Sequence, residues 1–280
     1  MQKRVLAIHD ISCVGRCSIT VALPIISACG IECSILPTAL LSTHTGDFRG
    51  YTFLDLSGEM EKILDHWASV DITFDAIYTG YLGSPDQVRT VSRAVSMFPG
   101  AKLIVDTVMG DKGHMYSGLS DEFTEVMRSL TSMADIITPN ATEAALLLGE
   151  EYHGEVYDEE TAADTARRLA DHTAGGAAVL TGVVKGGEIG AVACENGEVT
   201  CSFTKKEDGF FHGTGDVFAS ALVAGLMTGH RLTGSLAAAT EFTHRSIEEC
   251  IREGRPAKFG VPFEKALPGL VKTLTTEPVI

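Results

Sequence analysis

The stretch HGTGDVFASAL, residues 212–222, places two glycines and an aspartate at the start of an apolar segment. Gly213 and Gly215 allow a tight turn whose backbone N–H groups are not obstructed by side chains. At the start of a helix such N–H groups, together with the helix dipole, form a binding site for an anion such as phosphate. Asp216 falls in the first helical turn, where it is either a helix cap or a base.

Carboxylates elsewhere in the chain favour the interpretation of Asp216 as a base rather than as a helix cap. Asp106 and Asp111 in DTVMGDKG and Glu143 in TPNATEAALL are hard oxygen ligands, which Mg²⁺ prefers while keeping positions for water and phosphate. A base, an anion site and a carboxylate-held Mg²⁺ are the parts needed for phosphoryl transfer to a hydroxyl. We expect the dipole to keep Asp216 ionised, and therefore a weak base, which suffices when the proton leaves late.

Two other phosphate-binding motifs are excluded. The chain contains no Gly-x-x-x-x-Gly-Lys-Ser/Thr sequence, so it is not a P-loop protein. The pair Gly213-x-Gly215 lacks the third glycine of a dinucleotide fingerprint, because Phe218 stands there, and no acidic residue follows about 20 positions later. A Rossmann oxidoreductase is therefore disfavoured.

The elements that must position these residues alternate along the chain between short β-branched runs and helical patterns. Strands are predicted at 4–9, 32–37, 75–80, 102–107, 135–140, 177–182, 188–194 and 198–203. Helices are predicted near 17–29, 55–69, 85–97, 120–132, 142–149, 160–173, 217–228, 234–253 and 263–274. Runs that are apolar on both faces and separated by helices indicate an α/β fold with a mostly parallel sheet covered on both sides. The turn signal ENG at 195–197 predicts an antiparallel hairpin at one edge, and nothing divides the chain, so one domain is predicted over 1–280.

Polar residues recur where the predicted strands end. In an open parallel sheet, ligands bind beyond the carboxyl ends of the strands. The residues that follow the predicted strands are Asp10, Gly80–Tyr81, Asp106 with Asp111, Asn140 with Glu143, and Thr181–Gly182. Each one alone could be a turn or cap residue, but their recurrence predicts a site at this edge.

The composition indicates which classes of binding partner and which cellular compartment to expect. The chain has 280 residues, is 45% hydrophobic and carries a net charge of -15, which argues against nucleic acid as a partner because phosphate backbones need a positive footprint. No stretch is long and apolar enough for a membrane span, and the N-terminus lacks a signal-peptide core. Seven cysteines without a secretion signal predict reduced thiols in the cytoplasm, and without any Cys-x-x-Cys pair a zinc or iron–sulfur site is disfavoured.

Taken together, the motifs resemble the ribokinase-like superfamily and, within it, the pyridoxal/pyridoxamine kinase group, over essentially the whole chain. The segments that carry the resemblance are LLSTHTG (40–46), GYLGS (80–84), DTVMGDKGHMY (106–116), DIITPNATEAALL (135–147) and GTGD (213–216). The resemblance implies a ribokinase-like three-layer sandwich and ATP-dependent phosphorylation of the 5′-hydroxymethyl group of a vitamin B6 vitamer. It also implies Mg²⁺, small-molecule substrates and a homodimer, and it leaves a requirement for a monovalent cation such as K⁺ open.

Residue roles follow from the resemblance position by position. Asp216 is expected to be the base, and the backbone of Gly213, Thr214 and Gly215 to stabilise the transferring phosphoryl group. The expected ring contacts are Asp10, His44, Thr45 and Tyr81. The expected ATP contacts are Asp111, Tyr116, Asn140, Glu143 and Thr181, and the expected metal ligands are Asp106, Asp111 and Glu143.

Two positions depart from the better-known pyridoxal kinases. Asp10 stands where those enzymes commonly have a serine, and its carboxylate is able to accept a hydrogen bond from a protonated pyridine nitrogen or from the 3-hydroxyl. The departure leaves the preferred vitamer open. Thr107 replaces the usual proline after the aspartate, which is expected to matter little. Three nearby histidines are expected to be polar loop residues: His9, His114 and His212.

Two other functions remain as alternatives. Hydroxymethylpyrimidine kinase shares the fold, the base and a heteroaromatic CH₂OH substrate. A non-catalytic carrier or sensor of pyridoxal phosphate would keep the fold, although a pure binder has no need of Asp216 or the carboxylate set.

Overall fold

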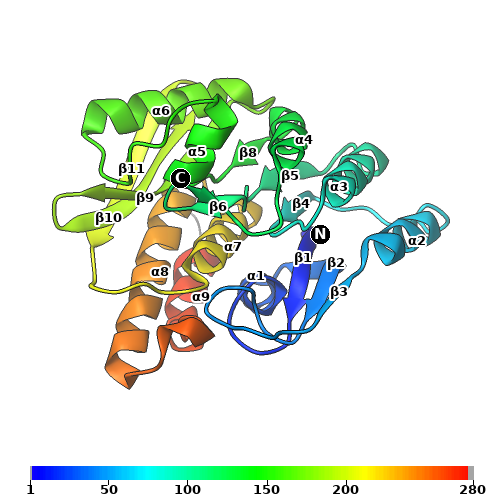
Figure 1. Cartoon of the computed structure of the whole chain (residues 1–280), viewed down its shortest axis with the longest axis horizontal. Coiled ribbons are helices and arrows are strands. Elements are labelled where there is room, and N and C mark those ends of the chain that lie inside the picture. The colour runs from blue at the N-terminus through cyan, green and yellow to red at the C-terminus, as the bar shows by residue number, and fades with distance from the viewer. Residues whose placement is uncertain (1, 277–280) are drawn as a thin grey trace.

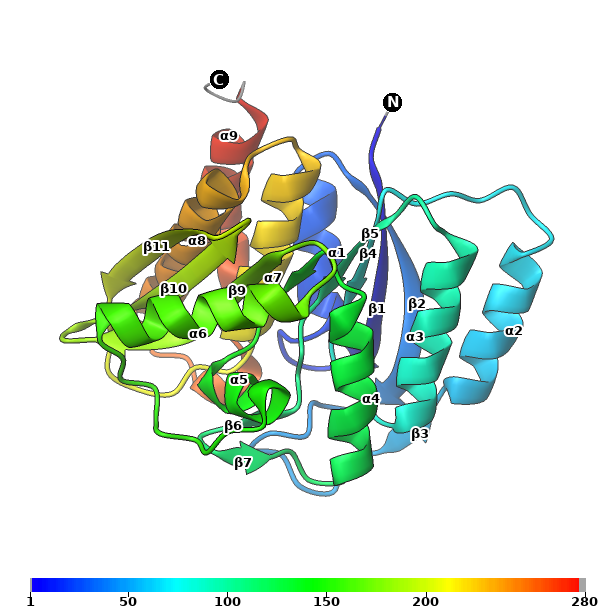
Figure 2. The ribbon, with the colours of Figure 1, turned by 90° about the horizontal axis from the view of Figure 1, so that it is seen from above.

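Nine strands form the central sheet of the computed structural model, which describes residues 2–276. Their order across the sheet is β11-β10-β9-β8-β5-β4-β1-β2-β3 (Figures 1 and 2). Their bounds are β1 Arg4–Ser12, β2 Glu32–Leu41, β3 Phe53–Asp55, β4 Ala76–Thr79, β5 Lys102–Val105, β8 Ile136–Ile137, β9 Ala177–Lys185, β10 Glu188–Glu195 and β11 Glu198–Lys205. The strands from β9 through β2 pair in parallel, whereas β10, β11 and β3 are antiparallel to their neighbours.

Helices cover both faces of this sheet, which gives three layers (Figure 2). One face carries α1 Ile19–Ala28, α7 Thr214–Met227, α8 Leu232–Glu253 and α9 Leu267–Thr275. The other carries α2 Ser57–Trp67, α3 Pro85–Met97, α4 Asp121–Ser132, α5 Ala141–Leu148 and α6 Glu159–His172. Successive strand side chains point to opposite faces, so Val5 and Ala7 pack into the first core and Leu6 and Ile8 into the second. The predicted α/β sandwich with a mostly parallel sheet and an antiparallel edge hairpin is confirmed.

The predicted elements are all present, with three differences. A short edge strand, β3, and a two-stranded ribbon of β6 Gly110–Asp111 and β7 His114–Met115 were not predicted, because each is too short to show a period. The predicted strand at 135–140 shortens to β8, because Asn140 already caps α5. The helix predicted at 263–274 begins instead at Leu267, and Pro268 occupies its first turn, where proline fits best.

The order of the strands locates the site. The chain passes from β1 to β2 on one side and later returns to β4 on the other side of β1. At such a switch point, adjacent connections leave the sheet on opposite faces and open a binding crevice beyond the strand ends. Asp10 near the end of β1 and Tyr81 just after β4 lie at this point.

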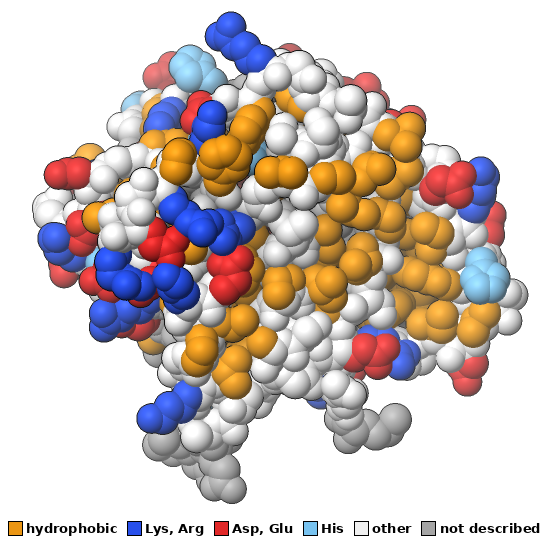
Figure 3. Space-filling model, turned by 90° about the horizontal axis from the view of Figure 1, so that it is seen from below, with side chains coloured by type: hydrophobic (Ala, Val, Ile, Leu, Met, Phe, Trp, Pro, Cys, Tyr) orange, Lys and Arg blue, Asp and Glu red, His pale blue; other side chains and the backbone are white. Residues whose placement is uncertain are grey.

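The surface shows apolar side chains on the side of the molecule that carries β2 and β3 (Figure 3). The large exposed ones on these two strands are Leu40, Phe53 and Leu54, which are 39%, 45% and 56% exposed. Among residues 2–276, no helix combines the length and hydrophobicity that crossing a membrane requires.

Candidate active site

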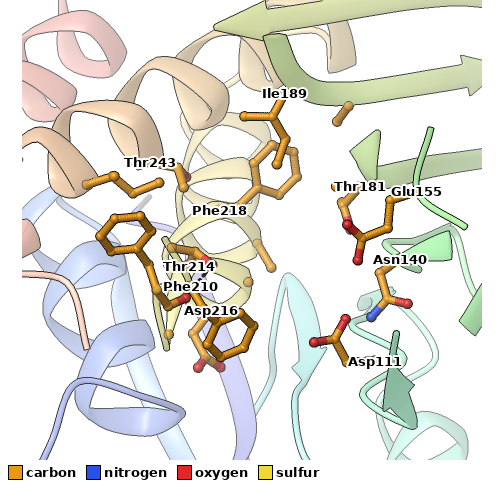
Figure 4. Close-up of a pocket in the computed structure, with 18 of the residues that line it drawn as sticks. Asp111, Asn140, Glu155, Thr181, Ile189, Phe210, Thr214, Asp216, Phe218 and Thr243 are labelled. Atoms are coloured by element: carbon orange, nitrogen blue, oxygen red, sulfur yellow. Dashed lines mark hydrogen bonds between the residues drawn. The ribbon is translucent and has the colours of Figure 1, made fainter. Parts of the chain in front are cut away.

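A cavity of about 540 Å³ opens between the start of α7 and the strand ends of the sheet. Figure 4 shows Asp111, Asn140 and Thr181 on one wall and Thr214 and Asp216 on the opposite wall. Ten of the predicted site residues line this cavity: Asp106, Asp111, Tyr116, Asn140, Glu143, Thr181, Gly213, Thr214, Gly215 and Asp216. Segments more than 100 residues apart in the sequence therefore meet here.

The start of α7 has the geometry of an anion site. Its first helical hydrogen bond runs from the Val217 N–H to the Gly213 carbonyl at 3.0 Å, so the N–H groups of residues 214–216 have no partner inside the helix. Gly213 has φ +75°, and a Cβ there would lie 2.1 Å from the Arg16 carbonyl oxygen. A Cβ on Gly215 would meet only open space, so glycine keeps the approach to these N–H groups clear.

Asp216 differs from the sequence-based expectation. Its pKa is raised to about 7: burial is the largest cause and the negative charge of Asp10 adds to it, while the backbone N–H of Ser18 lowers it. The expectation that the helix dipole would keep it a weak base was wrong, because desolvation of the carboxylate outweighs the dipole. A carboxylate with this pKa is a stronger base and is poised near neutral pH.

Asp106 lies in a buried concentration of negative charge. Its pKa is raised well above the usual value, first by burial and then by the charges of Glu143 and Asp216, and it receives one hydrogen bond from Thr138 at 3.1 Å. Several carboxylates buried together favour binding a cation that neutralises them. Within residues 2–276 no three acidic, histidine or cysteine side chains converge as a ready-made metal cage. Mg²⁺ uses one or two carboxylates and completes its shell with water and phosphate, and its binding here stays a prediction.

Glu143 is held by the protein itself. One carboxylate oxygen accepts from the Thr107 hydroxyl at 2.7 Å and from the Asn140 N–H at 3.0 Å, and the other accepts from the Met109 N–H at 2.8 Å. These bonds tie the loop after β5 to the start of α5. Thr107, which was expected to matter little, is fully buried and supplies one of them. The geometry therefore supports a positioning role for Glu143, and its role as a metal ligand stays a prediction.

Asn140 is similarly engaged. Its side-chain oxygen accepts from the N–H groups of Thr142 and Glu143, and with Glu143 it completes a capping box. Its amide donates to the Gly110 carbonyl at 2.9 Å and so fixes the β6–β7 ribbon that carries Asp111. Asn140 lines the cavity, but contact with ATP stays a prediction.

Asp10 lies next to Asp216 but does not line the cavity. It is 4% exposed, and burial raises its pKa, while hydrogen bonds from the hydroxyls of Ser18 and Ser12 lower it. The Ser12 bond measures 2.9 Å. Tyr81 is within range of the Asp10 charge, which adds to burial in raising the pKa of the Tyr81 phenol. Asp10 and Tyr81 thus form a second group of polar residues on the β1–β4 side of Asp216.

The loop after β2 completes this second group. The His44 Nδ1 accepts from the Gly46 N–H at 3.1 Å and its Nε2 lies 2.6 Å from the Lys258 carbonyl oxygen, so the ring is neutral with its proton on Nε2. Burial lowers the pKa of His44 in agreement with this. Its ring lies 4.9 Å from that of His212, which lines the cavity and pairs with Asp47 at 2.9 Å. Thr45 is exposed on the same loop, and its contact with a substrate stays a prediction.

His9 was predicted to be a polar loop residue, which was wrong. It lies within β1, is fully buried, and packs edge-on against Tyr78 with ring centroids 4.5 Å apart. Burial lowers its pKa to about 3, so the ring is neutral at physiological pH. A Cβ at position 80 would lie 2.2 Å from the His9 Nδ1, which explains the glycine at the end of β4. His212 lies in the loop before α7, as expected, whereas His114 is exposed but belongs to strand β7 rather than to a loop.

Comparison with known proteins assigns the chain to a family. The model of the phosphomethylpyrimidine kinase family matches residues 19–259, which is most of the chain. The chain belongs to the phosphomethylpyrimidine kinase family. It is therefore a kinase of the group that includes pyridoxal kinases and hydroxymethylpyrimidine kinases, and the resemblance noted from its motifs is confirmed.

The relatives of this chain are named either as kinases of B6 vitamers or as proteins of thiamine biosynthesis and phosphomethylpyrimidine kinases. The pyridoxine/pyridoxal/pyridoxamine kinase of Bordetella avium is 30% identical over 261 residues, which are 89% of this chain and 85% of that protein. The thiamine biosynthesis multifunctional protein ThiED of Corynebacterium efficiens is 30% identical over 262 residues, but the chain spans only 33% of its length. A crystal structure described as a phosphomethylpyrimidine kinase from Bacteroides thetaiotaomicron VPI-5482, with pyridoxal, is 36% identical, and the match covers 96% of each chain with a TM-score of 0.90.

Sequence reasoning did not single out Ser18 near the site and gave Thr107 too little weight. The hydroxyl of Thr107 donates to Glu143, and Ser18 lies close enough to Asp10 and Asp216 to lower the pKa of both. Serine and threonine are common in loops, and no spacing rule marks these two. The sequence offered only an indirect clue. A serine or threonine next to a carboxylate of one of the motifs is well placed to hydrogen bond with a carboxylate of the site.

Proposed function

We propose that this kinase transfers the γ-phosphoryl group of ATP to the 5′-hydroxymethyl group of pyridoxal, pyridoxamine or pyridoxine. The observation that carries the proposal is the position of Asp216, which stands between the anion site of α7 and the polar group of Asp10 and Tyr81. The 36% identical relative with pyridoxal supports the choice of a pyridine substrate.

In this proposal each group has one role. Asp216, with its pKa raised to about 7 by burial, accepts the proton of the substrate hydroxyl as the phosphoryl group arrives. The N–H groups of Thr214, Gly215 and Asp216 stabilise the charge on the phosphoryl oxygens. Asp10, Tyr81 and the neutral His44 orient the ring.

The metal proposed for this site is Mg²⁺. Asp106 and Asp111 would hold it, because Asp106 receives few hydrogen bonds and Asp111 lines the same cavity. When bound, Mg²⁺ would neutralise charge on the phosphate oxygens of ATP. Glu143 would keep the Asp106–Asp111 loop in place through the Met109 N–H and the Thr107 hydroxyl.

Replacing Asp10 with alanine is expected to raise KM for the vitamer about tenfold while KM for ATP stays nearly unchanged. The reason is that Asp10 contributes binding to only one of the two substrates, and a hydrogen bond to a charged group contributes about 1.5–3 kcal/mol. Steady-state kinetics with each substrate varied in turn measures both constants. An equal rise in the two KM values would instead make Asp10 a structural residue.

The pH dependence of kcat/KM is expected to show an acid limb with an apparent pKa near 7. Burial raises the folded-state pKa of Asp216, so below pH 7 the carboxyl is protonated and cannot accept a proton, and activity falls about tenfold per pH unit. Because the charge of Asp10 contributes to this rise, Asp10→Asn should move the limb to lower pH. A limb that arises from titration of ATP or of the vitamer would not move in this variant.

One assay separates the proposal from its alternatives. Purified protein is incubated with ATP, Mg²⁺ and each B6 vitamer, hydroxymethylpyrimidine or hydroxymethylpyrimidine phosphate, and the phosphorylated products are quantified. We expect the highest kcat/KM with a B6 vitamer. Preference for the pyrimidine would support the alternative that the family name and the ThiED relative suggest. Binding of pyridoxal phosphate without turnover of any substrate would indicate a carrier or sensor.

Oligomeric state and compartment stay predictions from the sequence. The homodimer that the resemblance implies is tested by light scattering of the purified chain, and a monomer would contradict it. Placement in the cytoplasm is tested by cell fractionation.

A further inference from the structure

The side chains of Lys112 and Phe210 meet across the outer edge of the cavity. Lys112 lies in the turn between β6 and β7, beside Asp111, whereas Phe210 belongs to the loop that leads into α7. Figure 4 shows Phe210 near Thr214 and Asp216, with Asp111 on the opposite wall. The Lys112 Nζ lies 4.0 Å from the centre of the Phe210 ring, which makes a cation–π contact. This contact joins the two walls of the cavity.

The ammonium group of Lys112 is not neutralised by a carboxylate. Within residues 2–276 it forms no salt bridge, and the neighbouring Asp111 carboxylate accepts from the Lys112 backbone N–H at 2.9 Å instead. Lys205 lines the same cavity, but its charge is already paired with Glu207 at 2.9 Å. Lys112 is exposed, and Phe210 is 48% exposed, so both are accessible to a ligand that enters the cavity.

The backbone that carries Lys112 is fixed to α5. The Gly113 N–H donates to the Thr142 hydroxyl at 2.9 Å, and the Asn140 amide donates to the Gly110 carbonyl at 2.9 Å. The turn between β6 and β7 is therefore held on both sides of Lys112. The flexible stem of the lysine is the part of this segment that is able to move.

The Phe210 ring is supported from the other side. It packs edge-on against the His212 ring with centroids 4.8 Å apart, and the His212 Nε2 lies 2.9 Å from the Asp47 carboxylate. A change of partner by Lys112 thus requires rotation of one side chain and no movement of either wall.

We propose that Lys112 binds the terminal phosphates of ATP, and that Phe210 holds its ammonium group before the nucleotide arrives, so that ATP binding exchanges one partner for the other. A charge-assisted hydrogen bond to phosphate is stronger than a cation–π contact at an exposed position, so the exchange favours the nucleotide. The inference rests on the proposed function only in that ATP is the phosphoryl donor, and it does not depend on which hydroxyl accepts the phosphoryl group.

The first test removes the charge of Lys112 in the full chain. Lys112→Met keeps the length of the stem, and it should raise the Kd of ATP about tenfold in isothermal titration calorimetry with Mg²⁺ and without vitamer. The Kd of AMP should stay unchanged, because AMP lacks the terminal phosphates. The control is Lys102→Met, which removes the same charge from an exposed residue at the start of β5, at the opposite end of the strand from the site. It should leave both constants at wild-type values.

The second test removes the competing partner. Phe210→Leu should lower the Kd of ATP about two- to fivefold, because the lysine no longer has to leave a cation–π contact. In the Lys112→Met background the same change should have no effect, because the contact is already absent. The control is Phe53→Leu, which alters a phenylalanine of similar exposure, 45%, on β3 and should not change the Kd.

A wild-type Kd of ATP in Lys112→Met, or an equal loss of affinity for AMP, would overturn the binding of the terminal phosphates. An unchanged or raised Kd in Phe210→Leu would overturn the exchange of partners. A wild type that binds ATP but phosphorylates no vitamer would instead contradict the proposed function, and the Kd comparisons would still decide the role of Lys112.

Discussion

Asp216→Asn is expected to lower kcat by roughly 10²–10⁴-fold, the usual contribution of a general base. Asparagine keeps the shape of the side chain in the first turn of α7, but its amide cannot accept the hydroxyl proton. Binding of ATP should stay nearly intact, because the N–H groups at the start of α7 come from the backbone. The measurements are kcat under saturating substrates and, separately, the Kd of ATP.

The matched control for this variant is Asp121→Asn. Asp121 is an exposed aspartate in the first turn of α4, so its replacement removes a comparable helix-dipole interaction away from the cavity. We expect wild-type kcat for Asp121→Asn. If Asp216→Asn also keeps wild-type kcat, Asp216 is not the base and the proposed mechanism is wrong.

Removal of the divalent metal is expected to abolish turnover altogether. Asp106 lies among the buried carboxylates of Glu143 and Asp216, and a net charge of -15 gives the chain no general attraction for ATP. EDTA should therefore reduce the rate to background, and added Mg²⁺ should restore it without refolding. Asp106→Asn should raise the Mg²⁺ concentration needed for half-maximal activity.

The melting temperature provides the control for chelation. Within residues 2–276 no three ligands converge as a closed metal cage, so the fold should not depend on the metal and EDTA should leave the melting temperature unchanged. A large decrease on chelation would indicate a structural metal and would contradict the site proposed here. Turnover that persists in EDTA would contradict the metal requirement itself.

Much of the fold could be predicted from local patterns. Buried strand segments such as β4 and residues 177–180 of β9 are mostly apolar runs, and α3, α4 and α6 show one apolar face each, because burial of that face is what forms the layer. The hairpin of β10 and β11 followed from its Asn196–Gly197 turn. The short strands β3, β6 and β7 could not be predicted, because two or three residues carry no period and their pairing depends on neighbours distant in the sequence.

The sequence by itself determined where the candidate site residues would lie in the fold. Polar residues at the ends of successive parallel strands must meet at one edge of the sheet, and a glycine pair before a helix must expose N–H groups there. Gly213, Asp216, Asp106 and Asp111 therefore line one cavity, as predicted.

Only the tertiary structure decided the pKa values and the hydrogen-bond partners of these residues. The pKa of Asp216 depends on how much water the fold excludes and on the distance to Asp10, more than 200 positions earlier. Whether Glu143 is free for a metal depends on the hydrogen bonds that Thr107 and Met109 bring to it. Desolvation and hydrogen bonding act through space between side chains that no sequence interval relates, so Ser18 was found only when α1 and α7 were placed side by side.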